Sequence, residues 1–404
     1  MAETLRLTFV SPHHPSESAW GLTHTLSAIC RRMVEKGHDV EVYYPVKSAS
    51  VPPTDSWEGV RAVPVGCFRA GRLPFGPDLE FSWRVARRIR VDRDVVMVHN
   101  ENGGSFVMRR TRALRRAGRP SPVAVAAFHG LGMRFLQTGR ERRPDRLRPR
   151  LGYFSDWAAL RLLEGGGARN ADVCVACSAA IGRELTSVYG VPARRIRVIY
   201  NGVEPQPAPT PEEREAARRA LGIGEGTLAL SFMGQDTHRK GLDVATGAVR
   251  LLTQRGLKVV LLNIGNDVPS TETMRSFGVV DGPTKRRILV ASDVFFLPTR
   301  YEGLPAVVQE AAALHRAVAT TAAANVEWGT PGKDFVLIEP NTAEAAADAL
   351  RPLLESEENR QAVAEGGFRE LGSRRYDQQT REYLDLFREL LSGATSEGNG
   401  APLH

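Results

Sequence analysis

The chain opens with an alternation of apolar and polar residues that is typical of a β-strand. This pattern covers Leu5–Val10, and apolar residues then recur at helical spacing over Leu22–Val34. Gly37 is expected to end that helix, and a second alternating stretch, Val40–Tyr44, follows it. A strand, a helix and a strand in succession predict a parallel sheet with right-handed crossovers.

Further apolar stretches predict two series of strands with helical segments between them. The first series continues with Val95–Val98, Val123–Phe128, Asp172–Ala176 and Ile196–Ile199, and the second comprises Leu228–Met233, Val259–Ile264, Asp293–Leu297 and Ala317–Thr320. Between them, proline stands at every second position from Pro205 to Pro211, which is typical of a semi-rigid linker. We therefore expect an α/β protein whose two doubly wound, Rossmann-like domains face each other across a cleft.

The domain boundaries follow from this pattern, and 404 residues suit two domains. Residues 1–204 are predicted to form the N-terminal Rossmann-like domain, and residues 205–375 the C-terminal one. Residues 376–391 carry an amphipathic helix that is expected to return to the N-terminal domain. Residues 392–404 are rich in Ser, Gly and Asn, so we expect a disordered tail.

Composition narrows the class of protein. Apolar residues make up 42% of the chain and charged residues 25%, as in soluble globular proteins. The net charge of +8 admits nucleic acid, a membrane surface or a phosphorylated ligand, but no zinc-finger or RNA-binding motif supports nucleic acid. We find neither a signal peptide nor an apolar run near the ~20 residues that span a bilayer. A cytoplasmic protein is expected.

The four cysteines are too few for a disulfide framework in a chain of this length. Cys174 and Cys177 have the spacing of a redox or metal pair, yet they fall in a predicted buried strand, where residues three apart face opposite sides. Since no second pair completes a zinc site, we expect a structural role for both and no metal site.

Two glutamates with seven residues between them form the main candidate site. Glu302 precedes Gly303-Leu304-Pro305, and Glu310 lies in the helix that Pro305 is predicted to begin at its first position. A wholly helical separation would be roughly 12 Å, near the length of a nucleotide-sugar from its sugar hydroxyls to its ribose. The intervening helix N-terminus suits a diphosphate. By spacing alone, two solvated glutamates on an ordinary helix explain the pattern equally well.

Glycine turns at the ends of predicted strands supply further candidates. Gly234 ends one strand, and a short turn separates it from Arg239 and Lys240, two cations that suit a diphosphate leaving group. A solvated basic turn is the alternative. Gly265 ends the next strand in the same way. His129 ends an apolar strand of the N-terminal half, a position where histidine more often has a structural role.

Taken together and in this order, these motifs resemble the GT-B glycosyltransferases of family 4, and the resemblance covers nearly the whole chain. Four segments carry the resemblance. Ser178–Val203 resembles the family's segment that joins the two domains, and Gly234 with Lys240-Gly241 resembles its phosphate turn. Phe277-Gly278 with Ala291–Asp293 and Pro298 resembles its nucleotide-contacting region, and Glu302–Pro305 with Glu310-Ala311 resembles its signature motif.

The resemblance implies a role for each residue of the C-terminal site. Glu302 would contact sugar hydroxyls, Glu310 would contact the ribose, and Lys240 would bind the diphosphate. Backbone amides of Gly303 and Leu304 would hold the diphosphate or the sugar. The C-terminal domain would thus bind the donor and the N-terminal domain the acceptor.

In the N-terminal half, the resemblance implies that His129 lies near the transferred sugar and that Gly21 lets the first loop approach the phosphates. Three positions depart from the family pattern and bear on how phosphate is held: Trp20-Gly21 replaces two adjacent glycines, Gln235 stands where an arginine often follows the glycine of the phosphate turn, and His315-Arg316 replaces small residues. Arg239 is expected to supply, from another backbone position, the charge that Gln235 lacks.

The arginine-dense segment Arg134–Arg150 has two interpretations. It is a solvated excursion from the core, or it is a patch for an anionic acceptor or a membrane surface. Acceptor selection is expected to fall to the loops near His13-His14, Asn100–Ser105 and Gly130–Gly152, since loops vary without disturbing a scaffold.

The sequence therefore predicts a retaining, metal-independent glycosyltransferase with a UDP- or GDP-sugar as donor and no further cofactor. The acceptor would be a small molecule of natural-product or thiol/cyclitol type, or a glycan or lipid. Alternatives are an epimerase or phosphorylase on the same scaffold, a non-catalytic nucleotide- or carbohydrate-binding protein, and a NAD-dependent enzyme. The last is weakened because no Gly-x-Gly-x-x-Gly follows the first strand.

Overall fold

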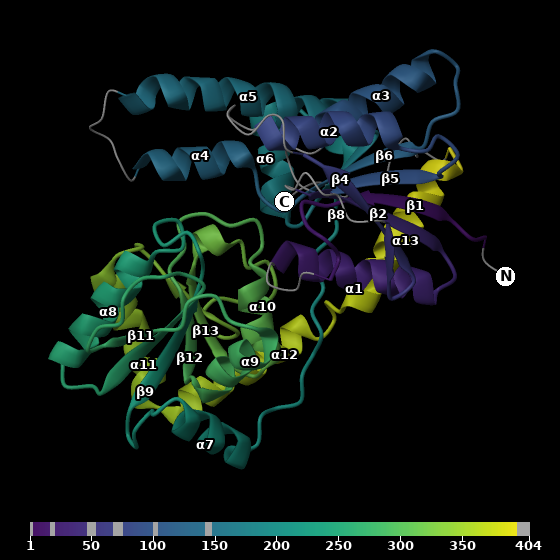
Figure 1. The fold of residues 1–404 in the computed structure, drawn as a ribbon. Helices are drawn as coiled ribbons and strands as arrows, with labels where there is room; N and C mark the ends of the chain where they lie inside the picture. Colours follow the sequence, from purple (N-terminus) through teal and green to yellow (C-terminus); the bar gives the residue numbers. More distant parts are fainter. Residues whose placement is uncertain are drawn as a thin grey trace. The chain divides into compact units, whose positions relative to one another are not determined.

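The computed structural model describes residues 3–16, 21–46, 54–67, 76–99, 104–141 and 148–393. It divides into two compact units, Met1–Gly202 with Tyr376–His404, and Val203–Arg375. The first division falls two residues before the boundary expected at 204/205, and the second coincides with the boundary expected at 375/376. Each unit has its own sheet with helices packed on it (Figure 1).

The first unit alternates strands and helices along the chain. Its elements are β1 (Arg6–Val10), α1 (Gly21–Glu35), β2 (Asp39–Val46), β3 (Asp55–Trp57), β4 (Val60–Gly66), α2 (Gly76–Arg88), β5 (Val95–His99), α3 (Ser105–Arg116), β6 (Val123–Phe128), α4 (Gly132–Glu141), α5 (Arg148–Asn170), β7 (Val173–Ala176), α6 (Ala179–Tyr189), the 3-10 turn η1 (Ala193–Arg195), β8 (Ile196–Val198) and α13 (Tyr376–Leu391).

Within the described ranges, the sheet of the first unit has the order β3-β4-β2-β1-β5-β6-β7-β8. Only the β3–β4 pair is antiparallel there. From β1 the order proceeds in both directions, which is the arrangement of a doubly wound sheet. The core of this unit joins β1, β2 and β5 to the apolar faces of α1 and α13.

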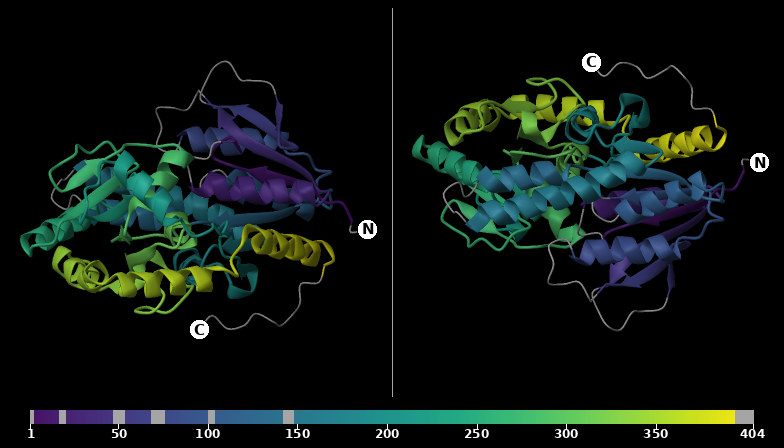
Figure 2. Two further views of the ribbon diagram at one scale, coloured as in Figure 1. Left: turned by 90° about the horizontal axis from the view of Figure 1, so that it is seen from below. Right: turned by 90° about the horizontal axis from the view of Figure 1, so that it is seen from above.

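The terminal helix α13 belongs to the first unit although it follows the whole second unit in sequence. Tyr383 and Phe387 on this helix are buried in the core, at 1% and 0% exposed. Figure 2 shows α13 beside α1, against which it packs. Burial of these aromatic rings is what holds the helix at this site.

The second unit repeats the alternation on a smaller scale. Its elements are α7 (Pro211–Ala220), β9 (Leu228–Met233), α8 (Leu242–Gln254), β10 (Val259–Ile264), β11 (Met274–Ser276), α9 (Gly282–Ala291), β12 (Val294–Leu297), α10 (Ala306–Ala313), β13 (Ala317–Thr321), the 3-10 turn η2 (Ala322–Ala324), β14 (Val336–Ile338), α11 (Ala343–Glu355) and α12 (Glu357–Leu371). Its strand order is β11-β10-β9-β12-β13-β14, and the pairs are parallel.

The strands that the pattern did not predict lie toward the edges of the sheets. β11 and β14 have three residues each, too few for an alternation to be read. β4 contains Pro64, and proline argues against a central strand. Pro64 is tolerated because the neighbouring strand β3 pairs with Val60–Ala62 and does not reach Pro64. The backbone N–H that proline lacks is therefore not needed to pair with β3.

Candidate active site

Two strand ends of the second unit carry the main candidate residues. β9 ends before Gly234 and the turn to Lys240, and β12 ends before the loop to Glu302. β9 and β12 are neighbours in the sheet, and the strand order reverses between them. Ligands of open α/β sheets bind outside the carboxyl ends of the strands at such a switch point. The strand order therefore brings Lys240 and Glu302, which are more than sixty positions apart in sequence, to the same edge of the sheet.

Glycine lets the two turns approach closely. Gly241 caps α8 in a left-handed conformation (φ 78°), and a Cβ there would overlap the carbonyl oxygen of Pro298 after β12. Gly265, also left-handed (φ 97°), lies against the backbone of Gly234. The side-chain amide of Asn266 donates to the Gly234 carbonyl at 2.9 Å. Side chains at these glycines would push the turns apart.

The loop after β12 is held from several sides. The backbone N–H of Arg300 and the Thr299 hydroxyl both donate to the Arg239 carbonyl, at 2.7 and 3.0 Å. The Asn325 side chain donates to the Glu302 carbonyl at 2.6 Å, and the Glu302 N–H donates to the Ala323 carbonyl at 2.9 Å. These bonds fix the backbone of Glu302 relative to the basic turn.

The side chains of both turns meet at one carboxylate. Glu302 Oε1 accepts Lys240 Nζ at 2.6 Å and also pairs with the Arg239 guanidinium. The Lys240 and Glu302 side chains are each 11% exposed. Burial lowers the pKa of Lys240, the nearby charge of Glu302 opposes that shift, and Arg239 adds to it. The sequence predicted separate tasks for these residues and did not predict that they contact one another.

The helix between the two glutamates starts one residue later than predicted. Pro305 is the N-cap of α10, not its first helical residue, and its carbonyl accepts the Val308 N–H at 3.1 Å. The steps from Glu302 to Pro305 are irregular loop, so the wholly helical 12 Å spacing does not apply. Gly303 and Leu304 lie in this loop, directly ahead of the helix N-terminus.

Glu310 lies within α10, as predicted, and forms an ion pair that the sequence did not indicate. Lys285 Nζ of α9 is 2.9 Å from Glu310 Oε2. The side chains remain partly exposed, at 28% for Lys285 and 18% for Glu310. Sequence reasoning missed Lys285 because it lies in an ordinary helix, 25 residues from its partner and outside any motif.

His129 lies in the first unit, at the carboxyl end of β6. Its Nε2 is 3.2 Å from Nδ1 of His99, and the two rings stack with centroids 5.4 Å apart. Burial lowers the pKa of His129 to about 4, although a hydrogen bond with Asn201 opposes the shift. Burial and the neighbouring ring also lower the pKa of His99. Both rings are therefore neutral near pH 7.

His99 could have been found from the sequence. It is the last residue of β5, directly after the predicted strand Val95–Val98, and β5 pairs with β6. Carboxyl ends of parallel strands meet at one edge of a sheet, which places His99 beside His129. Gly21 is the first residue of α1, and residues 17–20, Trp20 among them, lie outside the described residues.

A buried carboxyl group supports the turn that follows His129. Glu164 of α5 is fully buried and accepts the N–H of Gly132, at 3.0 Å, and that of Met133 at the N-terminus of α4. The Tyr189 hydroxyl donates to its other oxygen. Burial raises the pKa of Glu164 to about 7, against the lowering effect of these donors. Glu164 thus caps the helix that begins three residues after His129.

The other candidates from the sequence are placed as follows. Cys174 lies in β7 and Cys177 directly after it, both are buried, and burial raises the pKa of the Cys174 thiol to about 12. In the part of the chain that the structure describes, no three His, Cys, Asp or Glu side chains gather as a metal site requires.

The expected acceptor loops are only partly described. His14 bonds to Ser16, with Nδ1 and Oγ 2.6 Å apart. Residues 100–103, and residues 142–147 of the arginine-dense segment, lie outside the described residues, as does most of the predicted tail. Within that segment, Arg134 pairs with Glu184 at 3.0 Å. None of the described helices is both long enough and apolar enough to cross a membrane.

Comparison with protein families decides the class of this protein. The model of Glycosyltransferase Family 4 matches residues 21–207, and that of Glycosyl transferases group 1 matches residues 227–356. The two matches cover most of the chain and fall on its two units in turn. The chain belongs to glycosyltransferase family 4.

Relatives of this family 4 glycosyltransferase agree with the assignment. It is 24% identical over 414 residues to D-inositol 3-phosphate glycosyltransferase 1 of Catenulispora acidiphila, and the match covers 95% of this chain and 93% of the relative. The chain spans less than half the length of the first curated relatives that it matches.

Solved structures show that this glycosyltransferase has the GT-B fold. Sucrose-phosphate synthase from Thermosynechococcus elongatus aligns with a TM-score of 0.76 at 16% identity, over 96% of this chain and all of that one. Anabaena HepE in complex with UDP and glucose aligns with a TM-score of 0.69 at 14% identity, over 95% of this chain and 99% of that one. The predicted fold and family are thereby confirmed.

Proposed function

We propose that this glycosyltransferase transfers a sugar from a UDP- or GDP-sugar with retention of configuration and without a metal ion. The observation that carries the proposal is the contact of Lys240 and Arg239 with Glu302 at the switch point of the second unit. Lys240 and Arg239 are positioned to form charge-assisted hydrogen bonds with a diphosphate, and Asp236 also pairs with Arg239 at 3.6 Å. The UDP held by the structurally similar Anabaena HepE supports this choice of ligand.

In the proposed reaction, the bond between the anomeric carbon and the diphosphate oxygen breaks. Lys240, Arg239 and the amide groups at the N-terminus of α10 stabilise the charge on the departing diphosphate. The Glu302 carboxylate accepts hydrogen bonds from the sugar hydroxyls. The acceptor oxygen attacks on the same face, and its proton passes to the leaving diphosphate. No nucleophile from the protein is required.

Further residues would position the donor and the sugar. Glu310 accepts hydrogen bonds from the ribose hydroxyls, and Lys285 orients its carboxylate through the 2.9 Å ion pair. Gly234 and Gly265 keep the turns around the phosphates free of side chains, and Gly21 does so in the first unit. The neutral imidazole of His129 would hydrogen-bond a hydroxyl of the transferred sugar.

The acceptor that we propose is a small molecule of natural-product or cyclitol type. A relative that covers nearly the whole chain, a D-inositol 3-phosphate glycosyltransferase, supports a cyclitol, and a glycan remains the alternative. We place the reaction in the cytoplasm, which agrees with four buried cysteines that form no disulfide in the described part of the chain. An anionic membrane surface facing Arg134–Arg150 is the alternative setting for an acceptor.

A nucleotide thermal-shift screen followed by donor turnover tests the proposal. UDP or GDP is expected to raise the Tm of the full chain, because a ligand at about 100 times its Kd stabilises by about 2.7 kcal/mol. Donor turnover is then measured for Lys240→Ala and Glu302→Gln, with Arg351→Ala as a control on the exposed face of α11. The proposal is wrong if neither nucleotide shifts the Tm of folded protein, or if both site variants turn over at the wild-type rate.

A further inference from the structure

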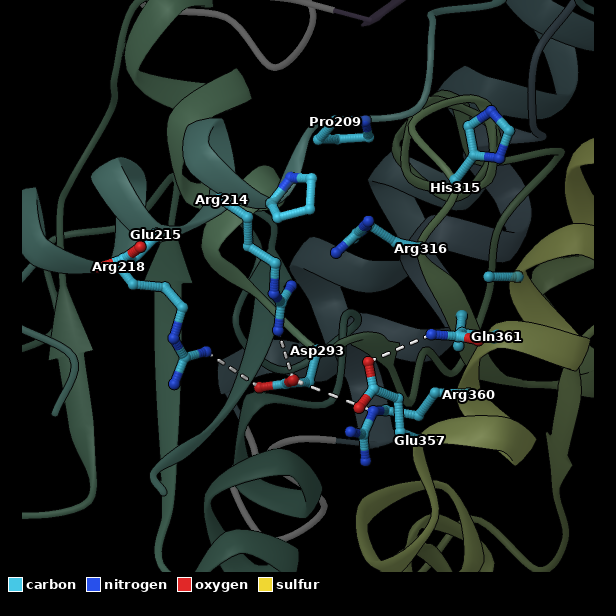
Figure 3. Close-up of a pocket in the computed structure, with 13 residues that line it drawn as sticks. Pro209, Arg214, Glu215, Arg218, Asp293, His315, Arg316, Glu357, Arg360 and Gln361 are labelled. Atoms are coloured by element: carbon cyan, nitrogen blue, oxygen red, sulfur yellow. Dashed lines mark hydrogen bonds and ion pairs between the residues drawn. The ribbon is translucent and has the colours of Figure 1, made fainter. Parts of the chain in front are cut away.

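A pocket of about 430 Å³ lies at the other end of strand β12 from Glu302. Asp293 directly precedes β12, and Arg316 directly precedes β13, so the pocket sits at the amino ends of these strands. Helices α7 and α12 supply most of the rest of its lining, and Pro209 precedes α7 (Figure 3). The whole pocket belongs to the second unit, and the proposed donor site uses none of its residues.

Three arginines share one buried carboxylate in this pocket. Asp293 pairs with Arg214 at 2.6 Å, with Arg218 at 3.3 Å and with Arg360 at 4.0 Å. Its side chain is 5% exposed and also accepts the Ala229 N–H at 2.7 Å. The single negative charge of the Asp293 carboxylate is shared among these contacts, so it cannot neutralise three guanidinium groups.

A fourth cation lines the pocket without an anionic partner. Arg316 donates to the carbonyls of Leu314 and Ser292, at 3.3 and 3.1 Å, and has no ion pair with a carboxylate of the described residues. Figure 3 shows its side chain directed toward Arg214. Burial, and after it the charge of Arg214, lowers the pKa of Arg316 to about 10, and the charge of Asp293 opposes this shift. Like charges this close and partly desolvated destabilise one another until an anion joins them.

The remaining carboxylates of the pocket do not balance this excess. Glu215 pairs with Arg219, which is not among the lining residues. Glu357 accepts the side-chain amide of Gln361 at 3.2 Å and forms no ion pair within the described ranges. Four guanidinium groups therefore line the pocket against the carboxylates of Asp293 and Glu357. Arg316 Nη2 and Arg360 Nη2 donate to no protein acceptor in the described chain, so they are free to bind a ligand.

We propose that this pocket binds a phosphorylated small molecule of monosaccharide size. Its phosphate would lie between Arg214, Arg316 and Arg360, because guanidinium groups match phosphate oxygens in geometry and charge. Its hydroxyls would reach Glu357 and Gln361, the lining groups that accept and donate hydrogen bonds. The volume is within the range of small-molecule sites.

His315 and Arg316 lie between α10 and β13, and both line the pocket. Arg316 supplies the unpaired cation. His315 adopts a left-handed conformation (φ 54°) that is uncommon for a residue other than glycine, and its ring stacks on Phe368 with centroids 3.7 Å apart. This stacking holds the backbone from which Arg316 extends.

Calorimetric titration of the full chain tests the proposal, with inorganic phosphate, glucose 6-phosphate and glucose as probes. We expect both phosphate probes to bind, glucose 6-phosphate more tightly, and glucose not to bind. Arg316→Ala is expected to weaken binding at least about tenfold, the usual effect of losing a charge-assisted contact. Gln361→Glu changes an exposed residue and is expected to weaken phosphate binding by adding a negative charge. It tests the same prediction if Arg316→Ala does not fold.

Two controls separate this pocket from other sites. Arg369→Ala removes one positive charge from an exposed position of α12, the helix that carries Arg360 and Gln361. This variant is expected to bind the phosphate probes like the wild type. Lys240→Ala removes a cation from the proposed donor site and is also expected to bind like the wild type. Loss of binding in Lys240→Ala with retention in Arg316→Ala would overturn the proposal, as would no binding by folded wild type. Equal affinity for inorganic phosphate and glucose 6-phosphate would overturn the proposed hydroxyl contacts.

Discussion

Lys240 Nζ lies 2.6 Å from Glu302 Oε1, so a cation expected at the diphosphate pairs with the carboxylate expected at the sugar. Arg239 pairs with the same oxygen. Glu302 thereby neutralises part of the charge that would attract a donor. A diphosphate entering this site would compete with Glu302 for the two cations, and the freed carboxylate would face the sugar.

Glu302→Gln tests this competition. Nucleoside diphosphate binding is expected to become tighter by a factor of a few, because Lys240 and Arg239 lose the carboxylate that they share, while Asp236 still pairs with Arg239. Sugar transfer is expected to fall about 10²- to 10³-fold, as when a preorganised polar group of an active site is removed. Calorimetry with UDP and GDP and donor turnover measure the two effects. Weaker nucleotide binding in the variant would contradict the competition between Glu302 and the diphosphate.

Glu310→Ala tests the ribose contact. Wild type is expected to bind UDP or GDP about tenfold more tightly than the 2′-deoxy nucleotide, since a carboxylate forms charge-assisted hydrogen bonds with ribose hydroxyls. In the variant the preference should disappear. In Lys285→Ala the preference is expected to shrink without disappearing, because the carboxylate stays in place and loses only the cation that orients it. An undiminished preference in Glu310→Ala would exclude the ribose role.

The His129 imidazole predicts a loss of stability in acid. Its pKa in the folded protein is about 4, below the ordinary 6.5, so the unfolded chain binds this proton more readily. The stability from the neutral ring is fully present above about pH 6.5 and is lost as the pH falls toward 4. Between about pH 8 and pH 5, wild type is expected to lose about 2 kcal/mol more than His129→Gln in urea unfolding. Parallel pH profiles would show that His129 titrates normally.

Glu164 predicts the opposite dependence in the same unit. Burial raises its pKa to about 7 from an ordinary 4.5, so the folded protein holds the proton more tightly than the unfolded chain. The stability from the protonated group is fully present below about pH 4.5 and is lost as the pH rises through 7. From about pH 5 to pH 8, wild type is expected to lose about 2 kcal/mol relative to Glu164→Gln. Urea unfolding of both proteins measures this difference, and a gain by wild type would contradict it.

Gly241→Ala is expected to destabilise the protein and the donor site together. A left-handed alanine costs roughly 1–2 kcal/mol, and its Cβ would also overlap the Pro298 carbonyl, which adds about 1–3 kcal/mol. Gly256→Ala is the matched control, because Gly256 is also left-handed (φ 91°) and nothing lies within 4 Å of its Cβ position. Urea unfolding should show a larger loss for Gly241→Ala. Equal losses would mean that the contact with Pro298 has no importance.

Regular elements were predictable where burial imposes a clear period. Val123–Phe128, Leu228–Met233 and Val259–Ile264 are strands with the predicted bounds, since each is a predominantly apolar run inside a sheet. Three-residue edge strands such as Met274–Ser276 carry too few residues to show a pattern. The start of α10 was misplaced by one residue because proline suits both the N-cap and the first helical position.

The sequence by itself determined the tandem α/β units, the family, and the individual site candidates, because apolar periodicity and glycine turns are local properties of the chain. Only the tertiary structure decided which of those candidates meet. The pairing of β9 with β12 brings Lys240 to Glu302, α9 brings Lys285 to Glu310, and β5 brings His99 to His129. Such contacts depend on strand order and helix packing, which no spacing along the chain records.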